Sequence, residues 1–236
     1  MKKTLLSITI LLVAVSCLFF TTGLSKQGNS VIKLNKNKLK PESISKLVKK
    51  NIESVDTNLV RINLDSLGII NDLKYATEDN FLKQKIYPCA ECYLREEVAK
   101  ALEKINSEAN SLGYKLVVFD CYRPFSAQIK MFSIIPDDKY VADPKKGASN
   151  HNKGIALDIT IASKDGKLLD MGSEFDEFSE KSHFSYSKIT EIAKNNRKTL
   201  KNLMVNGGFD PYENEWWHYS YQNKKYNTLD FTWSCE

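Results

Sequence analysis

The sequence predicts a single α+β domain in which a mainly antiparallel β-sheet is flanked by helices. Short segments with strand-like alternation and longer segments with helix-like apolar spacing follow one another along the chain. A turn-forming segment at residues 163–167 separates a strand from apolar residues that can return beside it, which favours antiparallel pairing. The 236 residues are enough for one domain with a sizeable core, and the composition is ordinary for a globular protein.

The N-terminus has the pattern of an export signal. Residues 1–23 begin with two lysines after the initial methionine and continue through an apolar run from Leu5 to Phe20. This run is slightly short to span a bilayer, so an export signal is favoured over a transmembrane anchor. Ala14-Val15-Ser16-Cys17 also resembles a bacterial lipoprotein box, although Ala14 replaces the usual larger aliphatic residue, and lipid attachment at Cys17 stays open. We therefore expect an exported protein of the periplasm or cell envelope.

A polar segment separates this signal from the expected domain. Residues 24–56 are rich in Lys, Asn and Ser, and they are expected to form a linker with at most one short helix after Pro41. The domain is then expected at residues 57–236. The net charge of +5 is modest, and much of the excess of basic residues lies in the N-terminal third. The charge pattern therefore does not predict nucleic-acid binding. Membrane contact is expected only through the N-terminal signal or a lipid on Cys17.

The cysteines point to disulfide bonds. Apart from Cys17, the chain contains Cys89, Cys92, Cys121 and Cys235, an even number in a chain that is expected to be exported. A redox-active Cys89-x-x-Cys92 pair, or half of a second zinc site, is disfavoured because the sequence has no partner Cys-x-x-Cys and no thioredoxin-like context. Four cysteines allow three pairings, and the sequence does not choose among them.

The first half of the domain is expected to contain two strands and two helices. Residues 59–64 have strand character. Apolar residues recur with helical spacing from Leu94 to Ile105, and Gly113 can end that helix. Residues 115–119 are a continuous apolar run typical of a buried strand. Pro124 follows closely, which discourages helix before it and favours a helix after it, so a strand-to-helix corner is expected there.

The second half is expected to add a central strand, a helix and an irregular segment. Residues 155–161 alternate as a half-buried strand does, with Asp158 on the face opposite the isoleucines. A helix ending at Gly207-Gly208 follows. Its expected apolar face consists of Ile189, Ile192, Ala193, Leu200, Leu203 and Met204. In a regular strand Glu215 and His218 would face opposite ways, so irregular backbone is expected between them.

Two segments place a histidine near a carboxylate. His151 precedes Gly154, which allows a tight turn, and Asp158 follows on the polar face of the strand. His218 ends Glu215-Trp216-Trp217-His218. Two imidazoles and one carboxylate, with a fourth position for water, are a ligand set of catalytic Zn²⁺, and a nearby Glu can serve as base. By spacing alone, structural histidines and an aromatic core strand are an equal alternative.

These segments together resemble a known family. Ser149-x-His151-x-x-Gly154-x-Ala156-x-Asp158, followed by Glu215-Trp216-Trp217-His218, is similar to the signature of the zinc D-alanyl-D-alanine dipeptidases. Other similar segments follow in family order: Asp72-Leu73-Lys74-Tyr75-Ala76-Thr77, Asp79-Asn80-Phe81, Tyr122-Arg123-Pro124, Asp170-Met171-Gly172 and Phe175-Asp176. The resemblance covers the chain from about residue 57 to the C-terminus. It implies one Zn²⁺ per chain held by His151, Asp158 and His218, with Glu215 as the base.

The resemblance also implies roles for four other residues. Arg123 is implied to stabilise the oxyanion of the tetrahedral intermediate, for which a fixed and permanently charged donor fork is suited. Tyr75, Ser149 and Asp176 are implied to bind substrate, with Asp176 recognising the free amino group. Ser149 can also brace the turn, and packing or surface positions are the alternatives for Tyr75 and Asp176. His183 is implied to be structural, although spacing alone allows it as a ligand in place of Asp158.

The activity implied by the resemblance is zinc-dependent hydrolysis of D-Ala-D-Ala to two D-alanines in the cell envelope, with this dipeptide as the small-molecule partner. A D,D- or L,D-carboxypeptidase acting on longer peptidoglycan peptides is an alternative, because it uses the same zinc chemistry. A non-catalytic, zinc-stabilised envelope binding module is another, and the presence of both Glu215 and Arg123 disfavours it. Stereospecificity, oligomeric state, and the choice between dipeptide salvage and wall remodelling stay open.

Overall fold

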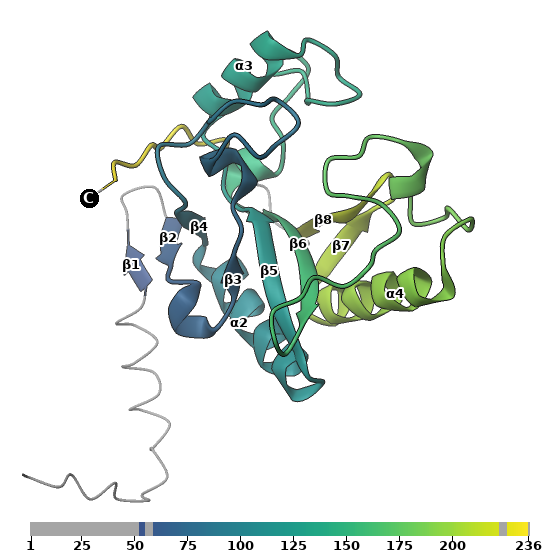
Figure 1. The fold of residues 1–236 in the computed structure, drawn as a ribbon. Coiled ribbons are helices and arrows are strands. Elements are labelled where there is room, and N and C mark those ends of the chain that lie inside the picture. Colours follow the sequence, from purple (N-terminus) through teal and green to yellow (C-terminus); the bar gives the residue numbers. More distant parts are fainter. Residues whose placement is uncertain (1–51, 55–58, 222–225, 236) are drawn as a thin grey trace, which may run out of the picture. The chain divides into compact units, whose positions relative to one another are not determined.

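The computed structural model describes residues 52–54, 59–221 and 226–235. In this part of the chain, two β-sheets are accompanied by the helices α2, α3 and α4, which confirms the α+β class (Figure 1). The expected export signal at residues 1–23, including Cys17, lies outside the described residues. So does the expected linker, apart from residues 52–54.

The larger sheet has five strands in the order β3-β5-β6-β8-β7. Its members are β3 (Ile70–Asn71), β5 (Tyr114–Asp120), β6 (Ala156–Ser163), β7 (Phe209–Tyr212) and β8 (Glu215–Tyr221). The short β3 pairs in parallel with β5, and all other neighbours are antiparallel. The expected mainly antiparallel sheet is therefore confirmed, and its central strand β6 is the one that carries Asp158.

The smaller sheet has three antiparallel strands in the order β1-β2-β4. They are β1 (Ile52–Ser54), β2 (Leu59–Ile62) and β4 (Cys92–Arg95). Strand β2 is the strand expected at residues 59–64, whereas β1 lies within the segment expected to be a linker. Four single-turn 3-10 helices lie between the main elements: η1 (Asp65–Leu67), η2 (Lys74–Ala76), η3 (His151–Lys153) and η4 (Glu180–Ser182).

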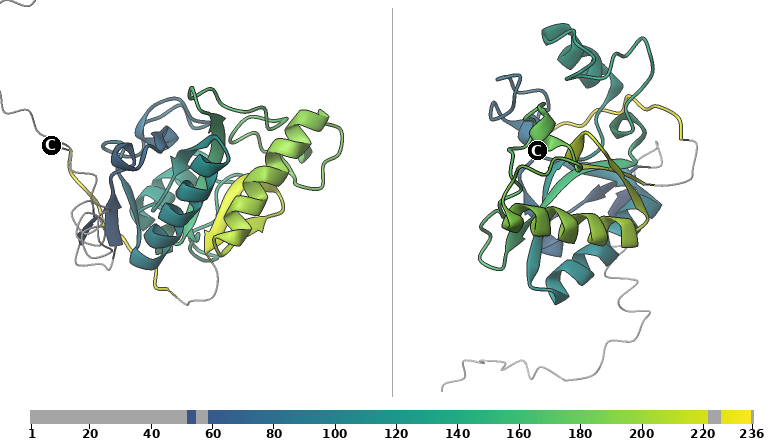
Figure 2. Two further views of the ribbon diagram at one scale, coloured as in Figure 1. Left: turned by 90° about the horizontal axis from the view of Figure 1, so that it is seen from below. Right: turned by 90° about the vertical axis from the view of Figure 1, so that its right-hand side faces the viewer.

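Helices α2 (Glu96–Ser111) and α4 (Glu191–Asn206) lie side by side against one face of the larger sheet (Figure 2). The expected apolar face of α2 is buried from Val98 to Ile105, but the helix does not begin at Leu94 as expected, because Leu94 lies in strand β4. Gly113 follows the helix with a positive φ of 87°. In α4, Ala193, Leu200, Leu203 and Met204 are buried as expected. Ile192 is 68% exposed, so its expected place on the apolar face was wrong. It precedes the buried stripe by one residue, which turns it about 100° away from the sheet.

Helix α3 (Phe125–Ile134) begins directly after Pro124, as the sequence predicted. Two of its first backbone N–H groups are satisfied by residues near the C-terminus. Phe125 N donates to the Leu229 carbonyl at 3.2 Å, and Ser126 N donates to the Asp230 carboxylate at 2.7 Å. The described C-terminal segment therefore caps the helix that follows the Arg123 corner.

Strand β6 differs from expectation in its burial. It was expected to be half-buried, but seven of its eight residues are buried, including Asp158 and Thr160. The strand lies between β5 and β8, and its polar side chains line cavities. The expected hairpin after it is reduced to a turn and one isolated bridge between Ala162 and Leu168.

The four cysteines within the described residues form two disulfides, Cys89–Cys235 and Cys92–Cys121. The expectation of disulfides is confirmed, and the structure selects one of the three pairings. Because Cys89 and Cys92 are each bonded to a distant residue, they form neither a redox pair nor a half-site for zinc. None of the helices in the described ranges combines the length and apolar character needed to cross a bilayer.

Candidate metal centre

Three elements bring the expected metal ligands together. His151 opens the single-turn helix η3, which ends at Gly154 with a φ of 72°. A Cβ at Gly154 would lie 2.5 Å from Leu59 Cδ2, so the turn requires glycine for both conformation and space. Asp158 of β6 pairs directly with His218 of β8, and directly opposed residues project from the same face of a sheet. The sheet register thus fixes two of the three ligands.

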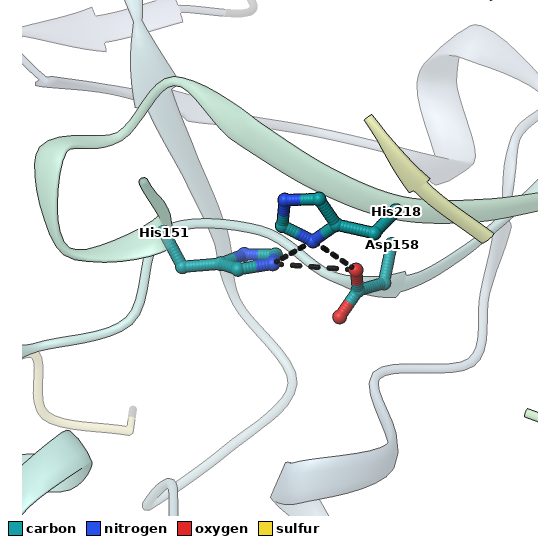
Figure 3. A group of neighbouring side chains, drawn as sticks. All are labelled: His151, Asp158 and His218. Atoms are coloured by element: carbon teal, nitrogen blue, oxygen red, sulfur yellow. Dashed lines mark hydrogen bonds and ion pairs between the residues drawn. The ribbon is translucent and has the colours of Figure 1, made fainter. Parts of the chain in front are cut away.

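The polar atoms of these three residues face one another (Figure 3). Asp158 Oδ1 lies 3.0 Å from His218 Nδ1 and 3.3 Å from His151 Nε2, and the two ring nitrogens are 3.2 Å apart. Ligands about 2.0 to 2.1 Å from a tetrahedral Zn²⁺ lie roughly 3.3 Å from each other. The separations and the two-nitrogen, one-oxygen donor set therefore fit zinc with a fourth position left open.

The remaining ring nitrogens have partners that orient them. His151 Nδ1 lies 2.6 Å from the Cys121 carbonyl, and since a carbonyl only accepts, Nδ1 carries the proton and Nε2 faces the cluster with its lone pair. His218 Nε2 lies 3.2 Å from Ser220 Oγ, which also accepts from Asn150 Nδ2. Both imidazoles are thus held in the orientation that a ligand needs.

The charges of the cluster are coupled. Burial would raise the pKa of Asp158, but the neighbouring His151 and His218 lower it below its ordinary value. Burial would lower the pKa of His151, but the carboxylates of Asp158 and Asp120 raise it above the usual value. In the protein without an ion, protonation of His151 at Nε2 would supply a countercharge to Asp158, whereas the neutral imidazole presents the Nε2 lone pair that a metal needs. A divalent cation would take over the role of countercharge.

Glu215 opens β8, where the backbone is irregular as predicted. Pro211 of β7 pairs with Tyr219, but the next residue, Tyr212, pairs with Glu215, so Trp216, Trp217 and His218 fall in a register shift. This shift allows Glu215 and His218 to line the same cavity. Removal from water raises the pKa of Glu215, and the positive character of His218 partly opposes that rise.

Arg123 lies at the corner between β5 and α3 and is 8% exposed. Its Nε and Nη2 donate to Asp120 Oδ2 at 3.2 and 2.8 Å, and its Nη1 donates to Gln128 Oε1 at 2.8 Å. Burial alone would lower the pKa of Arg123, but the Asp120 carboxylate holds it well above its ordinary value. Since a guanidinium has five N–H donors, these three hydrogen bonds do not use all of them, and Arg123 also lines the cavity.

Asp120 and Gln128 are site residues that the sequence analysis missed. The register between β5 and β6 shifts between Val118 and Asp120, which places Asp120 directly opposite Asp158 and turns it to the same face. The second Asp120 oxygen accepts from Tyr87 Oη at 2.8 Å and from the Cys121 N–H at 2.9 Å. A carboxylate at the end of a buried strand, three residues before Arg123, was the available signal.

Asp176 and Tyr75 meet on another wall of the cavity. Tyr75, which is 2% exposed, donates its hydroxyl to the Asp176 carboxylate at 3.0 Å, and the Arg123 guanidinium lies 5.2 Å from the centre of its ring. Loss of water contact and repulsion by Asp158 raise the pKa of Asp176 well above its ordinary value. Asp176 also has a φ of 59°, a left-handed conformation that Asp tolerates better than most residues.

Ser149 braces the turn that carries His151. Its hydroxyl accepts from the His151 N–H at 3.3 Å, and its own N–H donates to Asn152 Oδ1 at 2.9 Å. His183 is not part of the ligand group formed by His151, Asp158 and His218.

The residues singled out in the sequence line one cavity of about 420 Å³. They are Tyr75, Arg123, Ser149, His151, Asp158, Asp176, Glu215 and His218. Glu174 and Glu177, the acidic neighbours of Asp176, line a different hollow. The cavity therefore contains a metal-ligand set, a candidate base, a guanidinium and a carboxylate without an ion-pair partner in the described residues. These are the groups expected in the active site of a metallopeptidase.

Comparison with known proteins agrees with this chemistry. Residues 57–234 match the Peptidase M15 family model, described as D-Ala-D-Ala dipeptidase. The chain belongs to this family. The resemblance seen in the sequence motifs is thereby confirmed over nearly all of the described residues.

Relatives of this D-Ala-D-Ala dipeptidase family member include named enzymes. The D-alanyl-D-alanine dipeptidase of Escherichia coli (strain K12) is 40% identical over 165 residues, which cover 70% of this chain and 85% of that protein. The D-alanyl-D-alanine dipeptidase of Enterococcus faecalis (strain ATCC 700802 / V583) is 32% identical over 187 residues, covering 71% of this chain and 93% of its own. Among solved structures, the LdcB LD-carboxypeptidase aligns over 72% of this chain and 70% of its own, with 23% identity and a TM-score of 0.38.

Proposed function

We propose that this member of the D-Ala-D-Ala dipeptidase family hydrolyses free D-Ala-D-Ala to two D-alanines, using one Zn²⁺ held by His151, Asp158 and His218. Asp176 carries this proposal. It is a carboxylate on the cavity wall that accepts hydrogen bonds from the neutral Tyr75 hydroxyl, and within the described residues these bonds leave its charge unneutralised. The α-ammonium of a free dipeptide would supply the missing countercharge.

The three ligands leave one position open for water or substrate. When bound there, Zn²⁺ supplies a Lewis acid that polarises the scissile carbonyl and lowers the pKa of water. Folding contributes the arrangement of the ligands: the direct pairing of Asp158 with His218 and the turn that ends at Gly154 hold them in place. The polar partners of both imidazoles keep the lone pairs directed at the cluster.

Glu215 is proposed to move the proton of the reaction. As the water oxygen bonds to the carbonyl carbon, Glu215 accepts a proton from that water. It then delivers the proton to the amine nitrogen as the C–N bond breaks. A raised pKa of Glu215 suits both steps, because a carboxylate with a pKa closer to neutral is a stronger base toward the water proton and its acid form can still release that proton to the amine nitrogen.

Arg123 is proposed to stabilise the negative charge that develops on the carbonyl oxygen. Its position is fixed before substrate binds, because Asp120 and Gln128 hold three of its donors. A donor fork that needs no rearrangement during the reaction, in a site with little water, is effective at stabilising an oxyanion.

Asp176, Tyr75 and Ser149 are proposed to place the substrate. Asp176 would bind the ammonium group and reject a peptide whose amino group is acylated, because the acylated form cannot provide a positive charge. Tyr75 holds the carboxylate in position through its hydroxyl. Ser149 lies at the cavity wall next to the ligand turn and is proposed to contact the dipeptide there.

The site of action is proposed to be the periplasm or cell envelope. The apolar N-terminal run is the basis for export, and the two disulfides support it, since disulfides persist in oxidising compartments. Attachment to the membrane through a lipid on Cys17 is compatible with this location.

Alanine release from D-Ala-D-Ala, L-Ala-L-Ala and N-acetyl-D-Ala-D-Ala tests the proposal. We expect chelator-sensitive cleavage of the free D,D-dipeptide alone. In the Glu215→Ala variant, kcat should fall by about 10² to 10⁴ while the zinc content is unchanged, because only the proton transfer is lost.

Two outcomes would replace the proposal with an alternative. Efficient cleavage of the acylated substrate would indicate a carboxypeptidase, for which an ammonium-binding carboxylate has no use. Absence of all turnover by the fully zinc-loaded protein would leave an envelope binding module.

A further inference from the structure

The turn from Asp120 to Arg123 serves the metal centre with its backbone as well as its side chains. The Cys121 carbonyl accepts from His151 Nδ1 at 2.6 Å, and the Arg123 N–H donates to the His151 carbonyl at 3.1 Å. The turn and the ligand residue are therefore bonded in both directions. A displacement of Cys121 would move the group that fixes the tautomer and ring orientation of His151.

This turn is fastened to strand β4 at two adjacent positions. Cys121 is bonded to Cys92 through a disulfide, and the Tyr122 N–H donates to the Tyr93 carbonyl at 3.0 Å. Both cysteines are buried, each with an exposed fraction of 1%. The disulfide is therefore a covalent support on the same residue, Cys121, whose carbonyl orients a metal ligand.

The second disulfide has a different setting. Cys89–Cys235 ties an exposed residue near the C-terminus to the loop before β4, and the Trp233 indole N–H donates to the Cys89 carbonyl at 3.3 Å. Within the described part of the chain, neither cysteine is bonded to a metal ligand or to a residue of the Asp120–Arg123 turn. It closes a sequence separation of 146 residues, against 29 for the inner disulfide.

We propose that the Cys92–Cys121 disulfide is a positioning element of the metal centre, so that its formation raises the affinity of the protein for zinc. In the oxidised chain the Cys121 carbonyl is held against His151, and the ligand is preorganised. In the dithiol chain this support is reduced to hydrogen bonds. Loss of a partner that orients a ligating histidine typically weakens metal binding 10- to 100-fold.

A consequence follows for the enzyme before export, and it rests on the proposed function. A chain that has not yet formed this disulfide would bind zinc weakly. It would then spare any D-Ala-D-Ala in the reducing compartment where it is synthesised. The same oxidation that marks arrival in the envelope would complete the active site.

Two double variants form a matched pair for the test. One removes the inner disulfide (Cys92→Ala with Cys121→Ala) and the other removes the outer one (Cys89→Ala with Cys235→Ala). The zinc dissociation constant is measured by competition with a chromophoric chelator, and the unfolding free energy of the metal-free proteins is measured in urea. Neither readout uses D-Ala-D-Ala, so failure of the proposed activity would not affect the result.

We expect the inner variant to bind zinc at least tenfold more weakly than the unsubstituted protein, and the outer variant to stay within about threefold. The outer variant should lose at least as much stability, because its disulfide closes the longer loop. Equal zinc affinities in the two variants would overturn the proposal, whether both were unchanged or both weakened in proportion to stability.

A second measurement applies if the inner variant does not fold. The outer variant is loaded with zinc and treated with a water-soluble phosphine, which takes oxygen from water to become the phosphine oxide while the disulfide becomes two thiols. Zinc release is timed against thiol formation, with circular dichroism as the check on folding. Release that follows thiol formation supports the proposal, and zinc retained by the reduced, folded protein overturns it.

Discussion

The charged side chains on two walls of the cavity differ in what neutralises them. On one wall, the Arg123 guanidinium forms an ion pair with Asp120. The other Asp120 oxygen accepts hydrogen bonds from the Tyr87 hydroxyl and the Cys121 N–H. On the other wall, His151, Asp158 and His218 direct three polar atoms at one another across 3.0 to 3.3 Å. The first wall is completed by folding. Under the proposed function, the second would be completed by a cation, and Asp176 beside it by a substrate ammonium.

The difference predicts what each substitution should cost. On the wall completed by folding, a change removes a partner from a buried charge and should lower both stability and activity. On the wall completed by ligands, a change should act first on metal binding or catalysis, and it should affect the stability of the ion-free protein where it breaks the mutual stabilisation of Asp158 and His151. At Asp176 it should increase stability, because a carboxylate removed from water destabilises the ligand-free protein.

The largest effect is expected at the ligand cluster. His218→Ala removes one of three protein ligands, so the variant should lose stoichiometric zinc and its activity should fall to background. Metal content after dialysis and turnover of D-Ala-D-Ala are the measurements. His183→Ala is the matched control, because it removes an imidazole outside the cluster and should retain both zinc and activity. Full zinc occupancy in His218→Ala would disprove the ligand assignment.

Arg123→Lys tests the wall completed by folding. Lysine keeps the charge but cannot donate to Asp120 and Gln128 as a fork while it also faces the cavity. We expect kcat to fall by about 10² to 10³ and the unfolding free energy to fall by roughly 1.5 to 3 kcal/mol. Zinc content should not change. A loss of stability with unchanged kcat would make Arg123 a structural residue only.

The metal side of the site was accessible from sequence because its geometry is local or follows from strand pairing. The alternation of residues 155–161 predicted the face of Asp158, and Gly154 predicted the turn after His151. The incompatible faces of Glu215 and His218 in a regular strand predicted irregular backbone, which the register shift of β7 against β8 confirms. These inferences needed only the periods of a strand and the conformations of glycine.

The supporting contacts were not accessible in this way. Asp120 faces the site because of a register shift between β5 and β6, and no residue type in the sequence marks that shift. The cap of α3 by Asp230 joins residues 104 positions apart, and the partner of His151 Nδ1 is a backbone carbonyl. Any residue has a carbonyl, so its identity carries no signal. The burial of both faces of β6 likewise depends on what packs over the strand.

Asp176→Asn should have a smaller catalytic effect and an opposite effect on stability. Without the carboxylate, kcat/KM for free D-Ala-D-Ala should fall about 10- to 100-fold, and the preference over the N-acetylated dipeptide should narrow. Because the folded-state pKa of Asp176 is raised, the folded protein binds the proton more tightly than the unfolded chain. Stability from this group is therefore lost as pH rises from the unfolded pKa, about 3.9, through the folded pKa.

Urea unfolding of the metal-free proteins measures this difference. The asparagine variant does not ionise, so it should match the unsubstituted protein at acidic pH and exceed it above the folded pKa of Asp176. Taking the difference between the two proteins removes the contributions of other titrating groups. A variant that is less stable at every pH would show that the carboxylate is already compensated within the chain.

Tyr75→Phe is expected to have the smallest effect. It tests whether Tyr75, which contacts both Arg123 and Asp176, positions the Asp176 carboxylate. The substitution removes the hydroxyl that donates to Asp176 and leaves the ring beside Arg123. KM should rise about three- to tenfold with little change in kcat, as expected for the loss of one hydrogen bond worth about 1 kcal/mol. That hydrogen bond lowers the pKa of Asp176, so its loss should move the acid limb of kcat/KM to higher pH. A rise in KM without this shift would mean that Tyr75 supports the cavity wall by packing and does not hold the carboxylate for the substrate.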